Sequence, residues 1–125
     1  MKQTINSSKL SALGPYSHAV ATEGKLYYFS GQLGINAQTK EMGKTIEEQT
    51  KNSLENIDIL LTECGLTKDD VVKTTVLLSD INNFEAMNQV YGDYFTENHP
   101  SRSAFEVANL PANGLVEIEI IASGK

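Results

Sequence analysis

Hydrophobic and polar residues alternate in two runs within residues 100–123, and a turn containing Asn113 and Gly114 separates the runs. Alternation with a period of two is typical of β-strands, because successive side chains point to opposite faces of a sheet. Two such runs around a turn predict a β-hairpin. Pairing apolar face with apolar face then places Arg102 and Glu117 on the same polar face. We therefore predict a candidate site on this face of the sheet.

The rest of the chain predicts two helices and four further strands. Thr45, with Glu48 three residues later, begins an apolar pattern of helical spacing that ends at Gly65. Asn82 caps a second helix that extends to about Glu97. The expected strands before the hairpin are residues 3–6, 17–21, 26–32 and 71–78. The predicted order is β-β-β-α-β-α-β-β.

Two helices can cover one face of a mixed sheet of this size. We therefore predict an α+β fold in which residues 1–125 form a single domain. The other face of the predicted sheet carries Leu115 and Ile121 beside its polar residues. A second copy of the chain is the expected cover for this mixed surface, so we predict a homo-oligomer with a partly buried polar pocket between subunits.

Charge and cysteine content narrow the expected partners. The chain has a formal net charge of -6, and its lysines and arginines do not cluster, which disfavours a nucleic-acid partner. Cys64 is the single cysteine, so no internal disulfide can form, and we expect it to be a small buried side chain. Residues 1–12 lack the apolar core of a signal peptide, and no segment is long enough to cross a membrane. The expected location is the cytoplasm.

Few constellations of residues in the chain can carry chemistry. His18 and His99 are far apart, and Glu117 with Glu119 supplies too few oxygen ligands, so no metal site is expected. Arg102 can bind the carboxylate of a small molecule through two nitrogens, and Glu117 can activate a water molecule for attack on an adjacent carbon. A structural ion pair between Arg102 and Glu117 is the alternative. The residues alone indicate an anion site at a subunit interface and leave the reaction open.

Six motifs, in the same order along the chain, resemble the reactive intermediate deaminase family, also called the RidA or YjgF family. They are G-P-Y-S-H-A (14–19), S-G-Q (30–32), V-K-T-T-V (72–76), N-N-F-E-A-M-N-x-V-Y (82–91), R-S-A-F-E-V-A-N-L-P (102–111) and V-E-I-E (116–119). The resemblance extends from end to end. It implies a chorismate-mutase-like fold and a homotrimer with sites in the clefts between subunits.

The resemblance also implies an activity. Archetypal members hydrolyse enamine and imine intermediates, such as 2-aminoacrylate/2-iminopropanoate and 2-iminobutanoate, to 2-oxo acids and ammonia without a cofactor. Pyridoxal-phosphate enzymes release these intermediates. Arg102 matches the family's carboxylate-binding arginine, and Glu117 matches its water-positioning glutamate. The other matched positions line the substrate: Tyr16, Ser30, Gly31, Asn88 and Ala104.

Two other functions remain alternatives at this point. A non-catalytic module that binds small carboxylates would use the same intersubunit cleft. Ribonuclease activity is attached to some relatives, but the acidic charge and the lack of a basic groove count against it. Ala104 stands where many family members carry cysteine, so we expect this position to act through its backbone N–H.

Overall fold

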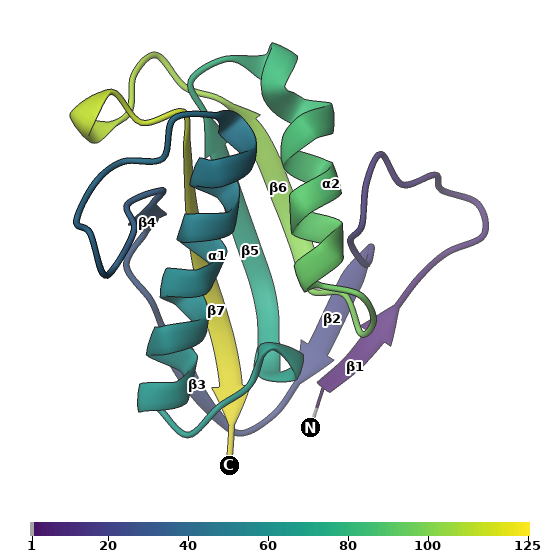
Figure 1. Ribbon diagram of the computed structural model, residues 1–125. Coiled ribbons are helices and arrows are strands. Elements are labelled where there is room, and N and C mark those ends of the chain that lie inside the picture. Colours follow the sequence, from purple (N-terminus) through teal and green to yellow (C-terminus); the bar gives the residue numbers. More distant parts are fainter. Residues whose placement is uncertain (1) are drawn as a thin grey trace.

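In the computed structural model, which describes residues 2–125, two helices lie on one face of a β-sheet (Figure 1). The strands are β1 (Lys2–Ile5), β2 (Ala19–Thr22), β3 (Lys25–Tyr28), β4 (Gln32–Leu33), β5 (Val71–Leu78), β6 (Ser101–Glu106) and β7 (Val116–Gly124). The helices are α1 (Ile46–Glu63) and α2 (Phe84–Tyr94), and short 3-10 turns occupy Lys68–Asp70, Ile81–Asn83 and Pro111–Asn113. Neither α1 nor α2, the two α-helices of the described residues, is long and apolar enough to cross a membrane.

The main sheet is mixed, and β7 and β5 are its inner strands. Its strand order is β3-β7-β5-β6, and β4 also pairs with β7. Strand β5 runs parallel to β6 and antiparallel to β7. Strands β1 and β2 form a separate two-stranded sheet, which lies beyond α2 in Figure 1. The predicted α+β architecture, a mixed sheet with both helices on one face, is confirmed.

Helix α1 begins and ends at the residues that the sequence predicts. The Thr45 hydroxyl accepts the backbone N–H of Glu48 at 3.1 Å and caps the first turn. At the other end, the N–H of Leu66 donates to the carbonyl of Leu61 at 2.8 Å, and Gly65 has a φ of 72°. This positive φ favours glycine, and the pattern of bonds is that of a Schellman motif. Local signals therefore fix both ends of α1.

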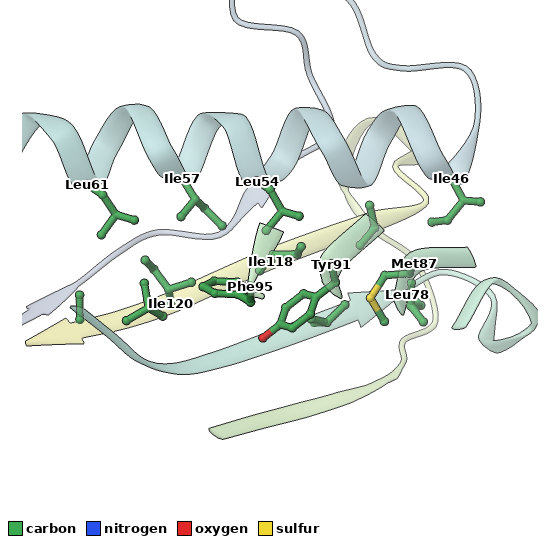
Figure 2. Close-up of a cluster of buried hydrophobic side chains, with 14 residues drawn as sticks. Ile46, Leu54, Ile57, Leu61, Leu78, Met87, Tyr91, Phe95, Ile118 and Ile120 are labelled. Atoms are coloured by element: carbon green, nitrogen blue, oxygen red, sulfur yellow. The ribbon is translucent and has the colours of Figure 1, made fainter. Parts of the chain in front are cut away.

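The hydrophobic core lies between the helices and the sheet (Figure 2). Leu54, Ile57 and Leu61 of α1, Met87 and Tyr91 of α2, and the adjoining Phe95 pack over Ile118 and Ile120 of β7; each is at most 2% exposed. Burial of these side chains supplies the main free energy that holds both helices against the sheet. The packing of α2 also determines which of its residues face β5 and β6.

The predicted hairpin within residues 100–123 is wrong, because β5 lies between β6 and β7. A strand, a helix and a second strand in succession are joined most readily as a parallel pair, and β5, α2 and β6 follow this rule. The connection to β7 crosses the end of β5, where the N–H of Val107 donates to the carbonyl of Leu78 at 2.8 Å. Alternation identified both strands but carried no information about their partners.

Three local expectations also differ from the structure. Asp80, not Asn82, caps the turn that leads into α2: its carboxylate accepts the N–H of Asn82 at 2.9 Å, and the helix ends at Tyr94. The predicted strand 26–32 is interrupted between β3 and β4. Cys64 is exposed rather than buried, because it is the C-cap of α1, where the chain turns away from the core.

Candidate functional site

Arg102 and Glu117 lie on opposite faces of the sheet. The register partner of Arg102 in β5 is Thr74, which pairs in turn with Ile120 on the buried, helix-covered face. Glu117 pairs with Leu77, three residues further along β5 and therefore on the open face. The prediction that Arg102 and Glu117 share one face is wrong, since it assumed that β6 and β7 pair directly.

The Arg102 side chain extends from β6 toward α2 and contacts aromatic rings. Its Nη1 donates a hydrogen bond to Oδ1 of Asn88 at 2.7 Å. Its guanidinium carbon lies 4.7 Å from the ring centroid of Tyr91, 5.3 Å from that of Tyr16 and 5.7 Å from that of Phe84. Three of these residues belong to α2, and Tyr16 precedes β2. We refer to these five residues as the Arg102 group.

The guanidinium of Arg102 has no anionic partner among residues 2–125: its one hydrogen bond there is to the neutral Asn88 amide. Burial lowers its pKa, and the neighbouring Tyr91 and Tyr16 partly oppose this effect. An arginine nevertheless keeps its charge in proteins. A partly buried cation with unused N–H donors attracts an anion, and its planar fork fits a carboxylate or phosphate.

The segment before β2 closes over the Arg102 group. The N–H of Leu13 donates to the hydroxyl of Tyr16 at 3.1 Å, and Nδ2 of Asn88 donates to the carbonyl of Leu13 at 3.4 Å. Between them, Gly14 passes so close to the guanidinium that an added Cβ would lie 2.5 Å from Nη2 of Arg102. A residue with a Cβ at this position would force the guanidinium to shift.

A second group of predicted residues gathers on the open face. Leu33 of β4 pairs with Glu117 of β7, and Gly31, which follows Ser30, lies against the glutamate. A Cβ added at Gly31 would overlap Oε2 of Glu117 and lie 2.9 Å from its Cδ. The Glu117 carboxylate makes no hydrogen bond or ion pair within the described part of the chain, residues 2–125. We refer to Ser30, Gly31 and Glu117 as the Glu117 group.

The structure thus divides the predicted site residues into two sets. Tyr16, Asn88 and Arg102 come together, and Ala104 lies two residues further along β6 on the same face. Gly31 and Glu117 come together on the other face, and Ser30 directly precedes Gly31. The sequence analysis missed three neighbours of the Arg102 guanidinium: Gly14, Phe84 and Tyr91. The succession of strand, helix and strand through β5, α2 and β6 could have indicated Phe84 and Tyr91, because it predicts a parallel pair covered by that helix. No such signal marks Gly14.

Two other features do not coincide with these groups. A hollow of about 750 Å³ runs along α1, where Asn52, Asn56 and Tyr94 contribute to its lining, but neither Arg102 nor Glu117 reaches it. Within residues 2–125, no cluster of three or more His, Cys, Asp or Glu side chains is arranged to hold a metal ion.

The fold and these groups define a small α+β protein in which Arg102, on the edge strand β6, has no anionic partner among the described residues 2–125. The chain is 47% identical over 123 residues to a RutC family protein of Pyrococcus abyssi, covering 97% of this chain and 96% of that protein. It is 44% identical over 125 residues to the 2-iminobutanoate/2-iminopropanoate deaminase of Capra hircus, covering 98% and 90%. The crystal structure of Escherichia coli TdcF with bound serine superimposes with a TM-score of 0.78 at 34% identity, covering 98% of this chain and 99% of that one.

Residues 6–123 match the family model described as endoribonuclease L-PSP. The chain therefore belongs to this family, which is the RidA family that its sequence motifs resemble.

Proposed function

We propose that this protein hydrolyses small 2-imino acids, such as 2-iminopropanoate and 2-iminobutanoate, to 2-oxo acids and ammonia. The observation that carries the proposal is the Arg102 guanidinium, which is partly buried and has no anionic partner among residues 2–125. Such a cation fits a substrate carboxylate. The name of the Capra hircus relative, 2-iminobutanoate/2-iminopropanoate deaminase, and the serine bound to TdcF support the same ligand class.

We propose that the site is completed between two copies of the chain, in the homotrimer that the family resemblance implies. One chain holds its Arg102 and Glu117 on opposite faces of the sheet, so one copy cannot present both to a small substrate. The open face exposes apolar surface that a neighbour would cover, including Tyr28 at 73% and Phe105 at 47% exposed. The edge strand β6 is also available, since beyond the bridge of Ser101 to Ser17 its outer edge pairs with no strand of residues 2–125.

In the proposed reaction, Arg102 binds the carboxylate and Tyr16 borders the substrate. The backbone N–H of Ala104 is the second carboxylate donor. Asn88 holds the guanidinium through its Oδ1. Gly31 of a second copy leaves room for the Glu117 carboxylate of that copy, which we propose faces the substrate.

The carboxylate of Glu117 orders a water molecule. As the oxygen of this water attacks C2 of the imine, the carboxylate accepts one of the water protons. That proton passes to the imine nitrogen, which leaves a hydroxyl and an amino group on C2. Transfer of the hydroxyl proton through Glu117 to the amino group then breaks the C2–N bond, so ammonia leaves and the C2=O bond of the 2-oxo acid forms. An enamine must first tautomerise to the imine. Because the imine carbon is already electrophilic, we propose that no cofactor is required and that catalysis comes from orientation and proton transfer. We propose that the protein acts in the cytoplasm and that pyridoxal-phosphate enzymes, which release imines, supply its substrate.

The test generates the imine with a threonine or serine dehydratase and follows release of the 2-oxo acid, with spontaneous hydrolysis measured in parallel. We expect the wild-type protein to accelerate release. Arg102→Ala should lower kcat/KM by about 100-fold, through loss of charge-assisted hydrogen bonds. Glu117→Gln should lower it by about 100-fold or more, through loss of the general base. Glu119→Gln, on the same strand and the same face, is the matched control and should keep wild-type activity.

Two outcomes would redirect the proposal. Binding of 2-oxo acids without any acceleration would favour a non-catalytic module that senses small carboxylates. Ribonuclease activity, which the name of the matching family suggests, would require binding of a polyanion by a chain of net charge -6. We therefore expect no salt-dependent RNA binding by the purified protein, and near-wild-type turnover by Arg102→Ala would contradict the assigned role of Arg102.

A further inference from the structure

Tyr91 is the aromatic residue nearest to the Arg102 cation. Its ring centroid lies 4.7 Å from the guanidinium carbon, nearer than the rings of Tyr16 and Phe84. Tyr91 is fully buried, at 0% exposed, whereas Tyr16 and Phe84 are only partly buried. A cation over an aromatic face is attracted by the negative charge of that face, and the attraction is stronger when water is excluded.

Contacts on the buried side of the Tyr91 ring hold the ring in place. Its hydroxyl forms a hydrogen bond of 2.7 Å with the hydroxyl of Thr74 in β5, and its ring packs 4.8 Å from the ring of Phe95 (Figure 2). Thr74 is also the register partner of Arg102 in the neighbouring strand. Tyr91 therefore links to Arg102 through space and to the strand beside Arg102 through its hydroxyl. This closed arrangement leaves the ring little freedom to turn away from the cation.

An aromatic ring stabilises a buried cation differently from a carboxylate. A carboxylate would accept hydrogen bonds from the guanidinium and would occupy the donors that a ligand needs. A ring face stabilises the charge and leaves those donors unused. In the Arg102 group, Asn88 accepts from Nη1, and the described residues 2–125 accept no other side-chain hydrogen bond from the fork. Its remaining donors are available to an anion.

We propose that Tyr91 is a positioning residue for anion binding, which holds the Arg102 guanidinium by its ring face and keeps the donor fork free for a substrate carboxylate. This inference rests on the proposed role of Arg102 in carboxylate binding. It predicts that the electron density of the ring at position 91, and not only its volume, sets the affinity for small carboxylates.

The test changes the ring's electron density while keeping its shape. Tyr91→Phe retains the ring, and replacement of the same residue by pentafluorophenylalanine withdraws electron density from its face. Pyruvate, a simple 2-oxo acid, is the probe, and its dissociation constant is measured by NMR titration of the full-length protein. We expect Tyr91→Phe to bind pyruvate within about threefold of wild type, and the fluorinated variant to bind about tenfold more weakly than Tyr91→Phe. Replacement of Phe95 by pentafluorophenylalanine is the control and should leave the affinity unchanged, because that ring contacts Tyr91 and not Arg102.

A second measurement concerns the ligand-free protein. The ring current of residue 91 should shift the Nε–H resonance of Arg102 upfield in the wild type and in Tyr91→Phe. Equal pyruvate affinity in Tyr91→Phe and the fluorinated variant, or an unshifted Arg102 resonance in the wild type, would overturn the inference. If the fluorinated variant does not fold, the resonance decides alone. A wild-type protein that binds pyruvate with the expected ring dependence but does not accelerate imine hydrolysis would refute the proposed function and leave this inference standing.

Discussion

The Arg102 group and the Glu117 group differ in how much of their surroundings one chain supplies. Around Arg102, α2 and the segment before β2 provide three aromatic rings and an amide that fix the cation. Around Glu117, the same chain provides a glycine and an open sheet face, and no hydrogen bond or ion pair from residues 2–125. One chain therefore holds the cation in place, whereas it leaves the carboxylate without a hydrogen-bond or ion-pair partner among residues 2–125.

This difference follows from what each charged side chain is proposed to do. A guanidinium that binds a carboxylate gains affinity from a fixed orientation, because less freedom is lost when the ligand binds. A glutamate that activates water must exchange both water and protons, so it needs access until substrate is bound. A site assembled from two copies meets both needs, since each copy brings a fixed cation to a neighbour's accessible base.

The strongest test of this division mixes two inactive variants, Arg102→Ala and Glu117→Gln. Each alone should lose about 100-fold or more in kcat/KM. Unfolded together and refolded as an equal mixture, they should form mixed oligomers in which some clefts receive an intact Arg102 from one copy and an intact Glu117 from the next. Random assembly should restore about a quarter of the wild-type activity, since each half is intact in half of the copies. The imine assay measures this directly.

Size-exclusion chromatography and mass spectrometry would show whether mixed oligomers form. If they form but activity does not recover, both residues act in one chain's site, and the division between the two groups is wrong. Each variant refolded alone is the control, and it should stay inactive. Refolded wild type, treated in the same way, sets the reference for a quarter of full activity.

A somewhat smaller effect is expected from a carboxylate placed inside the Arg102 group. Asn88→Asp has nearly the same shape as asparagine and puts an anion where Oδ1 now accepts from Nη1 at 2.7 Å. The internal ion pair would compete with the substrate carboxylate, so we expect KM to rise by at least about tenfold, with no loss in melting temperature. Steady-state kinetics with the dehydratase-generated imine and thermal unfolding are the two measurements.

Asn88→Ala is the matched variant, because it removes the hydrogen bond without adding charge. It should raise KM by less than Asn88→Asp does. If the two variants raise KM equally, the lack of an anion beside Arg102 is not what makes the site receptive, and the contrast with Glu117 loses its basis.

The sequence predicted those parts of the fold that local signals determine. The cap at Thr45, the left-handed Gly65 and the β-branched run of β5 each act within a few residues, and α1 and β5 lie where they were expected. Tyr16, Asn88 and Arg102, which the structure brings together, were named from motif resemblance and not from local signals.

Strand pairing could not be read from the same signals. The alternation in β6 and β7 is equally compatible with direct pairing and with a strand between them, and this choice decides which face carries Arg102. The buried Thr74 of β5, at 0% exposed, is a polar position on an otherwise apolar face, and its partners Tyr91 and Arg102 are 17 and 28 residues away along the chain. Long-range tertiary contacts of this kind leave no periodic trace.

The smallest expected effect comes from a variant that changes the space around the Arg102 guanidinium without changing any charge. In Gly14→Ala the new Cβ would lie 2.5 Å from Nη2 of Arg102 and just over 3 Å from the Asn88 amide, so the guanidinium must shift. We expect KM to rise by about fivefold, equivalent to about 1 kcal/mol, with kcat nearly unchanged because Glu117 is on the other face.

Gly92→Ala in α2 is the control: its Cβ would meet Pro15 at an ordinary 3.5 Å, and alanine favours a helix over glycine by about 1 kcal/mol. If Gly92→Ala raises KM as much as Gly14→Ala does, any added methyl group near the segment before β2 disturbs substrate binding, and the contact of Gly14 with Arg102 has no special role. An effect confined to Gly14→Ala would show that its close approach to Arg102 orients the cation.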